Sequence, residues 1–172
     1  MDIVNISMFH KISFITQIAL NHFLTRIVIM KIISQSEFEK HNLFGQGEPN
    51  VNYAKYFIGQ SYLNLLTAKS PLLVANVTFE PGCRNNWHIH HASQGGGQIL
   101  LCTAGSGWYQ KYGDKPISLE PGMVITIPAN VKHWHGAKVD SWFSHIAIEV
   151  PGEDTYNEWC EAVSEEDFQK LC

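Results

Sequence analysis

Six of the nine histidines in this 172-residue chain lie between residues 88 and 145. They include two pairs of the form His-x-His, His88 with His90 and His133 with His135. Residues two apart in a β-strand point to the same face, so each pair can present two imidazoles to one point. Each buried imidazole has a donor and an acceptor to satisfy, and a shared divalent cation removes that cost. The spacing therefore predicts that His88, His90 and His133 bind one metal ion, the alternative being surface or singly satisfied core histidines.

The same alternation predicts the direction in which the other histidines of this region point. His135 faces the same way as His133, so it either orients a substrate and relays a proton, or is a buried histidine with hydrogen-bond partners. His145 lies in a third apolar segment, with Phe143 on its face. His91 points away from His90, and we expect it to be structural or exposed.

The segments around these histidines have the pattern of an all-β domain. Short runs rich in β-branched and aromatic residues are each bounded by turn signals such as Glu-Pro-Gly or a glycine cluster. Many short strands at this spacing indicate a sandwich or a barrel. The expected strands cover residues 72–79, 98–103, 107–112, 124–127 and 142–150.

Four parts of the chain are distinguished by composition. Residues 1–30 are apolar but repeatedly interrupted by polar side chains, which indicates an N-terminal extension, either an amphipathic helix or a non-native upstream segment. Residues 31–70 are expected to form an arm and linker with a short helix over 36–41, and residues 71–152 the barrel. Residues 153–172 are expected to form a helical tail that starts at the N-cap Ser164.

Composition excludes several classes of partner. With 45% hydrophobic residues, 16% charged residues and a net charge of −4, the chain has no basic field for nucleic acid or an anionic membrane. Its four cysteines lack zinc-ribbon or redox spacing, so we expect reduced thiols and a cytoplasmic protein. With those partners excluded, we expect the protein to act on a small molecule.

Two stretches resemble the conserved motifs of the cupin superfamily. The first is Gly82, five residues, His88-Ile89-His90, then Gln98, six residues and Gly105. The second is Gly122, five residues, Pro128, then Asn130 and His133. This resemblance implies a double-stranded β-helix, the jelly-roll barrel of that family, here with an irregular or helical N-terminal arm and a short C-terminal helix.

The sequence departs from the family pattern where a glutamate usually follows the histidine pair. Gln98 and Gln94 compete for that place, and we prefer Gln98 because it lies on the apolar strand, whereas Gln94 lies in a glycine-rich loop. A neutral amide would leave the charge of the ion uncompensated by the protein. Asn130 replaces the usual turn glycine, and asparagine tolerates the positive φ that such a turn needs.

Within the superfamily the chain most resembles small bacterial cupins typified by manganese-dependent hydroxynitrile lyases. The resemblance implies that His88, His90, Gln98 and His133 hold one divalent transition metal, manganese first and iron, nickel or zinc as alternatives. It also implies that His145 acts in catalysis and that the protein is a homodimer. His145 is not needed to complete the metal shell, so it is free to act as a general base, with His135 as its candidate helper. We therefore expect lyase chemistry on a small hydroxylated or carbonyl compound. The alternatives are an iron-dependent dioxygenase and a non-catalytic binding protein.

Overall fold

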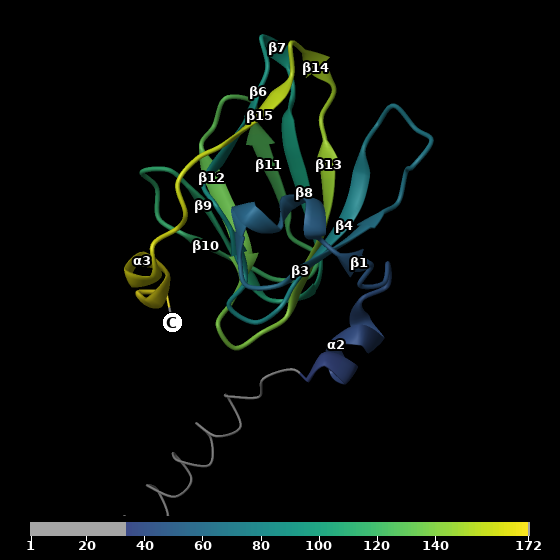
Figure 1. The fold of residues 1–172 in the computed structure, drawn as a ribbon, viewed down its shortest axis with the longest axis vertical. Helices are drawn as coiled ribbons and strands as arrows, with labels where there is room; N and C mark the ends of the chain where they lie inside the picture. The colour runs from purple at the N-terminus through teal and green to yellow at the C-terminus, as the bar shows by residue number, and fades with distance from the viewer. Residues whose placement is uncertain (1–33, 172) are drawn as a thin grey trace, which may run out of the picture. The chain divides into compact units, whose positions relative to one another are not determined.

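Two antiparallel β-sheets form the part of the chain that the structure, a computed structural model, describes: residues 34–171 (Figure 1). The extension expected over residues 1–30 lies outside the described residues. In spatial order the first sheet contains β1 (Glu48–Pro49), β3 (Ser61–Leu65), β4 (Val74–Phe79), β13 (Phe143–Glu149), β8 (Gly97–Gly105) and β11 (Val124–Pro128). This is the expected all-β jelly-roll barrel.

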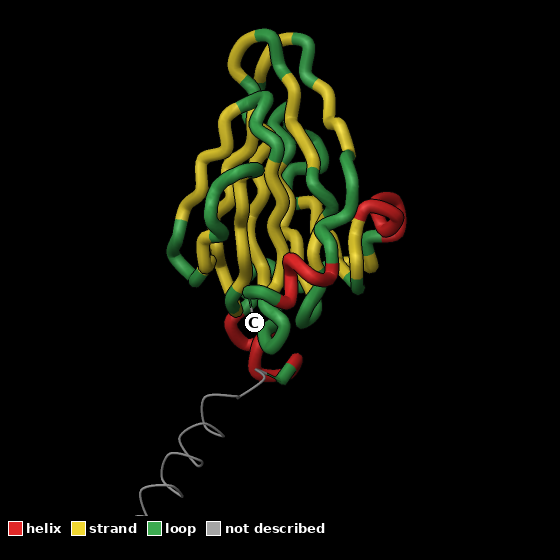
Figure 2. The backbone as a smooth tube through the Cα atoms, turned by 90° about the vertical axis from the view of Figure 1, so that its left-hand side faces the viewer, coloured by secondary structure: helices red, strands yellow, loops and turns green. Residues whose placement is uncertain are grey.

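The second sheet carries most of the histidines. Its strands, in spatial order, are β10 (Ile117–Leu119), β9 (Gly107–Lys111), β12 (His133–Ala137), β5 (Arg84–Asn85) and β2 (Phe57–Ile58). Strand β6 (His88–His91) pairs with both β12 and β15 (Tyr156–Trp159). A separate two-stranded sheet joins β7 (Gln94–Gly95) to β14 (Gly152–Glu153). Figure 2 shows the strands side by side, with the short helices outside them.

The core forms where the inner faces of the two sheets meet. Along β8 burial alternates, so that Gln98, Leu100 and Cys102 are buried while the residues between them are partly exposed. This period of two is the reason that a strand rich in apolar residues can still present one polar side chain, Gln98, to the interior. Leu100 packs in a cluster with the buried side chains of Phe79, Leu119, Ile127 and Phe143.

Segments on both sides of the barrel residues also pair with its strands. Within the expected arm, β3 pairs along β4 from Ser61 opposite Phe79 to Leu65 opposite Ala75. The arm also contains the helix α2 (Gln35–His41), which confirms the helix expected at 36–41, and the 3-10 helix η1 (Val51–Tyr56). Strand β15 extends the second sheet before the helix α3 (Glu165–Gln169) begins.

Two turns require a left-handed backbone. Gly105 has a φ of +67°, and a Cβ at this position would overlap the carbonyl oxygen of Trp142, so only glycine fits between β8 and β9. Asn130 has a φ of +64°, which confirms the expectation that asparagine takes the place of the turn glycine. Its side chain also donates to the carbonyl of Ala92 at 2.9 Å, which helps to hold the turn ahead of His133.

Helix α3 is attached to the barrel by the buried Arg84 and by the packing of Phe168 against Trp134. Ser164 caps the helix by accepting from the backbone N–H of Asp167, as expected. Arg84 on β5 donates to Glu165 at 2.8 Å, and its guanidinium lies 4.1 Å from the ring centroid of Phe168. The stem and charge of Arg84 therefore position the C-terminal helix.

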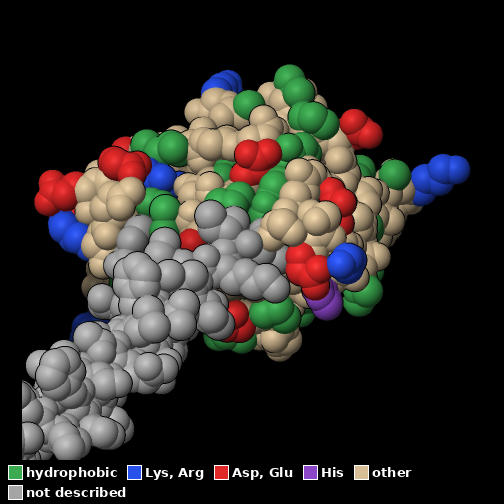
Figure 3. All heavy atoms as spheres, turned by 90° about the horizontal axis from the view of Figure 1, so that it is seen from below, with side chains coloured by type: hydrophobic (Ala, Val, Ile, Leu, Met, Phe, Trp, Pro, Cys, Tyr) green, Lys and Arg blue, Asp and Glu red, His purple; other side chains and the backbone are tan. Residues whose placement is uncertain are grey.

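One face of the described residues carries charges of both signs. In the face shown in Figure 3, acidic and basic side chains are interspersed between polar and apolar ones. No helix within residues 34–171 is long and apolar enough to cross a membrane.

Candidate metal centre

The three histidines of the predicted metal site converge inside the barrel. His88 and His90 come from β6, and His133 on β12 pairs directly opposite His88. Each of the three offers a ligand atom, these atoms lie within 4.8 Å of one another, and all three residues are buried. That separation allows the three to share a single ion.

Backbone carbonyls orient two of the imidazoles. The Nδ1 atom of His88 lies 2.9 Å from the carbonyl oxygen of Asn86, and Nδ1 of His133 lies 2.9 Å from that of Val131. A carbonyl oxygen can only accept, so each Nδ1 carries the proton and each Nε2 keeps its lone pair. Nε2 is the atom with which these two residues would bind a metal.

The two glutamines have very different environments. Gln94 lies on β7, exposed in the outer two-stranded sheet, opposite Glu153. Gln98 is buried, its amide nitrogen donates to Oε1 of Glu149 at 2.9 Å, and its amide oxygen has no hydrogen-bond partner. A buried oxygen without a hydrogen-bond partner destabilises the fold unless a ligand binds it. This supports Gln98 over Gln94 as the fourth metal ligand.

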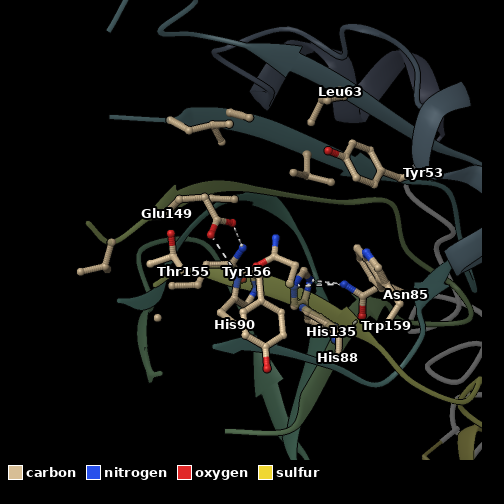
Figure 4. Close-up of a pocket in the computed structure, with 18 of the residues that line it drawn as sticks. Tyr53, Leu63, Asn85, His88, His90, His135, Glu149, Thr155, Tyr156 and Trp159 are labelled. Atoms are coloured by element: carbon tan, nitrogen blue, oxygen red, sulfur yellow. Dashed lines mark hydrogen bonds and ion pairs between the residues drawn. The ribbon is translucent and has the colours of Figure 1, made fainter. Parts of the chain in front are cut away.

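Sequence analysis did not identify Glu149 as part of the site. Its Oε2 lies 3.0 Å from Nδ1 of His90, an ion-pair distance without the alignment of a hydrogen bond (Figure 4). The expectation that the protein leaves a bound dication uncompensated is therefore wrong, because a carboxylate contacts two of the expected ligands. The available signal was alternation: Glu149 lies four residues after His145, on the same face of β13.

His135 and His145 form a second pair of imidazoles. Nε2 of His145 lies 3.2 Å from Nδ1 of His135, and both residues are buried and line the same cavity. Asn85 accepts from the backbone N–H of His135 at 2.9 Å, so its amide nitrogen faces the ring, 3.1 Å from Nε2. The same amide nitrogen lies 3.3 Å from Nδ1, so a proton on either Nδ1 of His135 or Nε2 of His145 can link the two rings (Figure 4 shows Asn85 beside His135).

Burial keeps these imidazoles neutral. Loss of solvation lowers the pKa of His133 to about 4 and that of His145 to about 3. The pKa values of His88 and His135 are also lowered, first by burial and then by the neighbouring histidines. At neutral pH these four imidazoles are therefore uncharged, the state that metal ligation requires of a histidine.

Unpartnered atoms point to a metal as the missing partner. Within the described residues, Nε2 of His90, Nε2 of His133 and Oε1 of Gln98 are buried without a hydrogen-bond partner. Nitrogen and oxygen donors of this kind suit a divalent transition metal. The family and this buried triad together indicate a divalent metal site.

A cavity of 730 Å³ opens beside the histidines. One wall is polar and contains His88, His90, Gln98, His135 and His145. The opposite wall is apolar and comes largely from β3, β4 and η1, including Tyr53, Leu63 and Val77. Trp159 stacks on His88 with ring centroids 4.9 Å apart. The arm and β15 extend the walls of the cavity beyond the barrel strands.

The remaining aromatic and histidine residues have structural roles. Trp134 and Trp142 are buried in separate hydrophobic clusters, and Trp87 packs partly buried against Trp134. His91 contacts Glu158 at 2.7 Å and Asn130 at 3.0 Å, and both of its ring nitrogens are thereby engaged, which confirms its expected structural place. Trp159, which no sequence motif marked, is the tryptophan of the described residues that lines the cavity.

A jelly-roll barrel with a histidine triad beside an internal cavity defines the class of this protein. Comparison with known proteins gives a match to the cupin domain over residues 75–144. An (R)-mandelonitrile lyase from Granulicella tundricola is 38% identical over 120 residues, which are 68% of this chain and 88% of the relative. The crystal structure of a cupin-like protein from Thermotoga maritima is 34% identical, with a TM-score of 0.65 over 75% of this chain and 96% of that one. The chain belongs to the cupin superfamily.

Proposed function

We propose that this protein is a metal-dependent lyase that cleaves a small hydroxylated compound into a carbonyl compound, with a cyanohydrin as the test substrate. The observation that carries the proposal is the buried pair His135–His145, which adjoins the triad and lines the same cavity. Similarity to a mandelonitrile lyase supports the reaction type. His88, His90, Gln98 and His133 would hold the ion, with manganese as the first candidate.

In the proposed mechanism a bound cation would stabilise negative charge, and the histidine pair would transfer the proton. A divalent cation held by these four residues supplies Lewis acidity, which stabilises negative charge that develops on the substrate oxygen. The pair His135–His145 takes the hydroxyl proton, and its 3.2 Å separation allows the two imidazoles to share one positive charge. Sharing matters because burial lowers the pKa of His145 to about 3, which makes a single imidazole a weak base.

The remaining bond changes of the proposed reaction occur in the substrate. As the hydroxyl proton leaves, the electrons of the O–H bond form the carbonyl, and the carbon–cyanide bond breaks with its electron pair on cyanide. The proton held by the histidine pair then passes to cyanide and hydrogen cyanide leaves. The apolar wall formed by Tyr53, Leu63 and Val77 would bind the organic substituent, and a 730 Å³ cavity is within the usual range of about 300–1,000 Å³ for small-molecule sites.

Metal content and turnover of three variants test this proposal. We expect the purified full chain to contain one transition metal per protein, and to release benzaldehyde from mandelonitrile without oxygen. His145→Ala should lower kcat about 10²-fold or more with the metal retained, whereas His133→Ala should lose the metal. His41→Ala, at an exposed position on α2, is the matched control.

Two results would contradict the proposal. Absence of a stoichiometric metal from the wild-type protein would remove its basis. Strict dependence of turnover on iron(II) and oxygen would instead indicate the dioxygenase.

A further inference from the structure

Glu149 joins two expected metal ligands through one carboxylate. It is the last residue of β13 and pairs directly opposite Gln98 on β8. Oε1 accepts from the amide nitrogen of Gln98 at 2.9 Å, and Oε2 lies 3.0 Å from Nδ1 of His90. Both contacts use the atoms of Gln98 and His90 that would not bind the ion (Figure 4 shows Glu149 beside His90). The side chain is 32% exposed, toward the cavity.

We propose that Glu149 is a positioning residue that orients Gln98 and His90 for metal binding and supplies the negative charge that Gln98 lacks. This inference rests on the proposed metal site. The family pattern places a glutamate among the ligands, whereas this chain has a neutral amide there and a carboxylate behind it. The charge is thus retained at the site, but it is contributed by a different strand.

The contact with Gln98 fixes which end of the amide faces the triad. A carboxylate only accepts, so the amide nitrogen must point to Glu149 and the oxygen must point away from it. That oxygen is buried and unpartnered, as a metal ligand would be before the ion binds. Without the carboxylate, an amide can rotate and present its nitrogen, which cannot ligate a cation.

The contact with His90 acts on the imidazole in a similar way. His88 and His133 each have a backbone carbonyl at Nδ1, whereas the group beside Nδ1 of His90 is Glu149. A carboxylate at this atom favours the tautomer with a proton on Nδ1 and the lone pair on Nε2, and raises the basicity of the ligand. Glu149 therefore occupies the place beside Nδ1 of His90 that a carbonyl occupies in the other two, at an ion-pair distance and not in an aligned hydrogen bond.

A direct role for Glu149 as a metal ligand fits the geometry less well. Both of its oxygens are already directed at the outer atoms of Gln98 and His90. From behind the ligands its charge still attracts a dication, because the interior has a low effective dielectric constant.

The metal affinity of Glu149→Gln tests the proposal. This substitution keeps size and an acceptor oxygen but removes the charge. We expect manganese(II), titrated calorimetrically into chelator-treated protein, to bind about 10- to 100-fold more weakly than to the wild type. Glu153→Gln, the same change at an exposed residue on β14, should stay within about twofold.

A double variant separates charge from simple packing. Gln98→Glu combined with Glu149→Gln moves the carboxylate to the place that the family pattern gives it. We expect this pair of changes to restore manganese affinity to within about threefold of the wild type, and a merely structural role for Glu149 would give no rescue. Circular dichroism of the metal-free variants checks that each is folded.

The outcomes distinguish this inference from the function it rests on. If the wild-type protein binds neither manganese nor another divalent transition metal, both are wrong. If the wild type binds but Glu149→Gln binds equally well, the inference is wrong and the proposed function stands. If Glu149→Gln keeps its metal affinity but loses turnover, Glu149 contacts the substrate and is not a positioning residue.

Discussion

Acidification should strongly destabilise the metal-free protein, because its buried imidazoles resist protonation in the folded state. The perturbation is a change from pH 8 to pH 5 in the presence of a chelator. His133 and His145 are buried, and their pKa values fall from 6.5 to about 4 and about 3. At pH 5 the unfolded chain therefore binds protons that the folded protein does not bind.

The direction and size of the change in the free energy of unfolding follow from this difference in proton binding. A lowered pKa on a base contributes stability that is present above pH 6.5 and is lost as the pH falls toward the folded pKa. At pH 5 each of the two imidazoles removes about 2 kcal/mol, so together they remove about 4 kcal/mol. His88 and His135 have lowered pKa values and add to the loss in the same direction. A domain of this size has about 5–15 kcal/mol in total, so unfolding near pH 5 is expected.

Denaturant unfolding at several pH values measures this dependence. The free energy of unfolding, followed by tryptophan fluorescence in urea, should fall steadily from pH 7 to pH 5. Carboxyl groups with lowered pKa values, such as Glu161, titrate below this window and do not account for the fall. His145→Asn should reduce the pH dependence by about 2 kcal/mol, whereas His41→Asn, at an exposed position, should not. An unfolding free energy that is constant or higher at pH 5 would refute the reasoning.

Three further predictions concern stability. Arg84→Met should lower the free energy of unfolding by about 2 kcal/mol, because α3 loses its charged contact and its ring contact. Thermal denaturation should show a smaller effect for Glu165→Gln, the exposed partner of the same ion pair. Asn130→Ala should cost about 1–3 kcal/mol in urea unfolding because alanine lacks both the tolerance of positive φ and the bond to Ala92, and Asn130→Gly should cost less. Manganese at 100 times its dissociation constant should stabilise the folded protein by about 2.7 kcal/mol, and calorimetric melting that does not respond to the metal would contradict a site formed by the folded state.

Sequence alone predicted the features that depend on local spacing. Alternation at a period of two placed His88 and His90 on one face of a strand and marked His133 as their counterpart. Turn signals bounded the strands, and the residue preference for positive φ correctly predicted the backbone at Asn130. These features depend on neighbouring residues, so they can be read without knowing how the strands pair.

Tertiary pairing decided the rest of the site. Gln98 and Glu149 are 51 residues apart and meet because β13 pairs with β8 in one particular register. The same kind of long-range pairing brings Asn85 to His135 and places Trp159 against His88. A shift of one residue in any of these registers would turn the side chains to the other face, and that register is set by packing across the whole barrel. For this reason the charge balance of the metal centre became visible only in the folded structure.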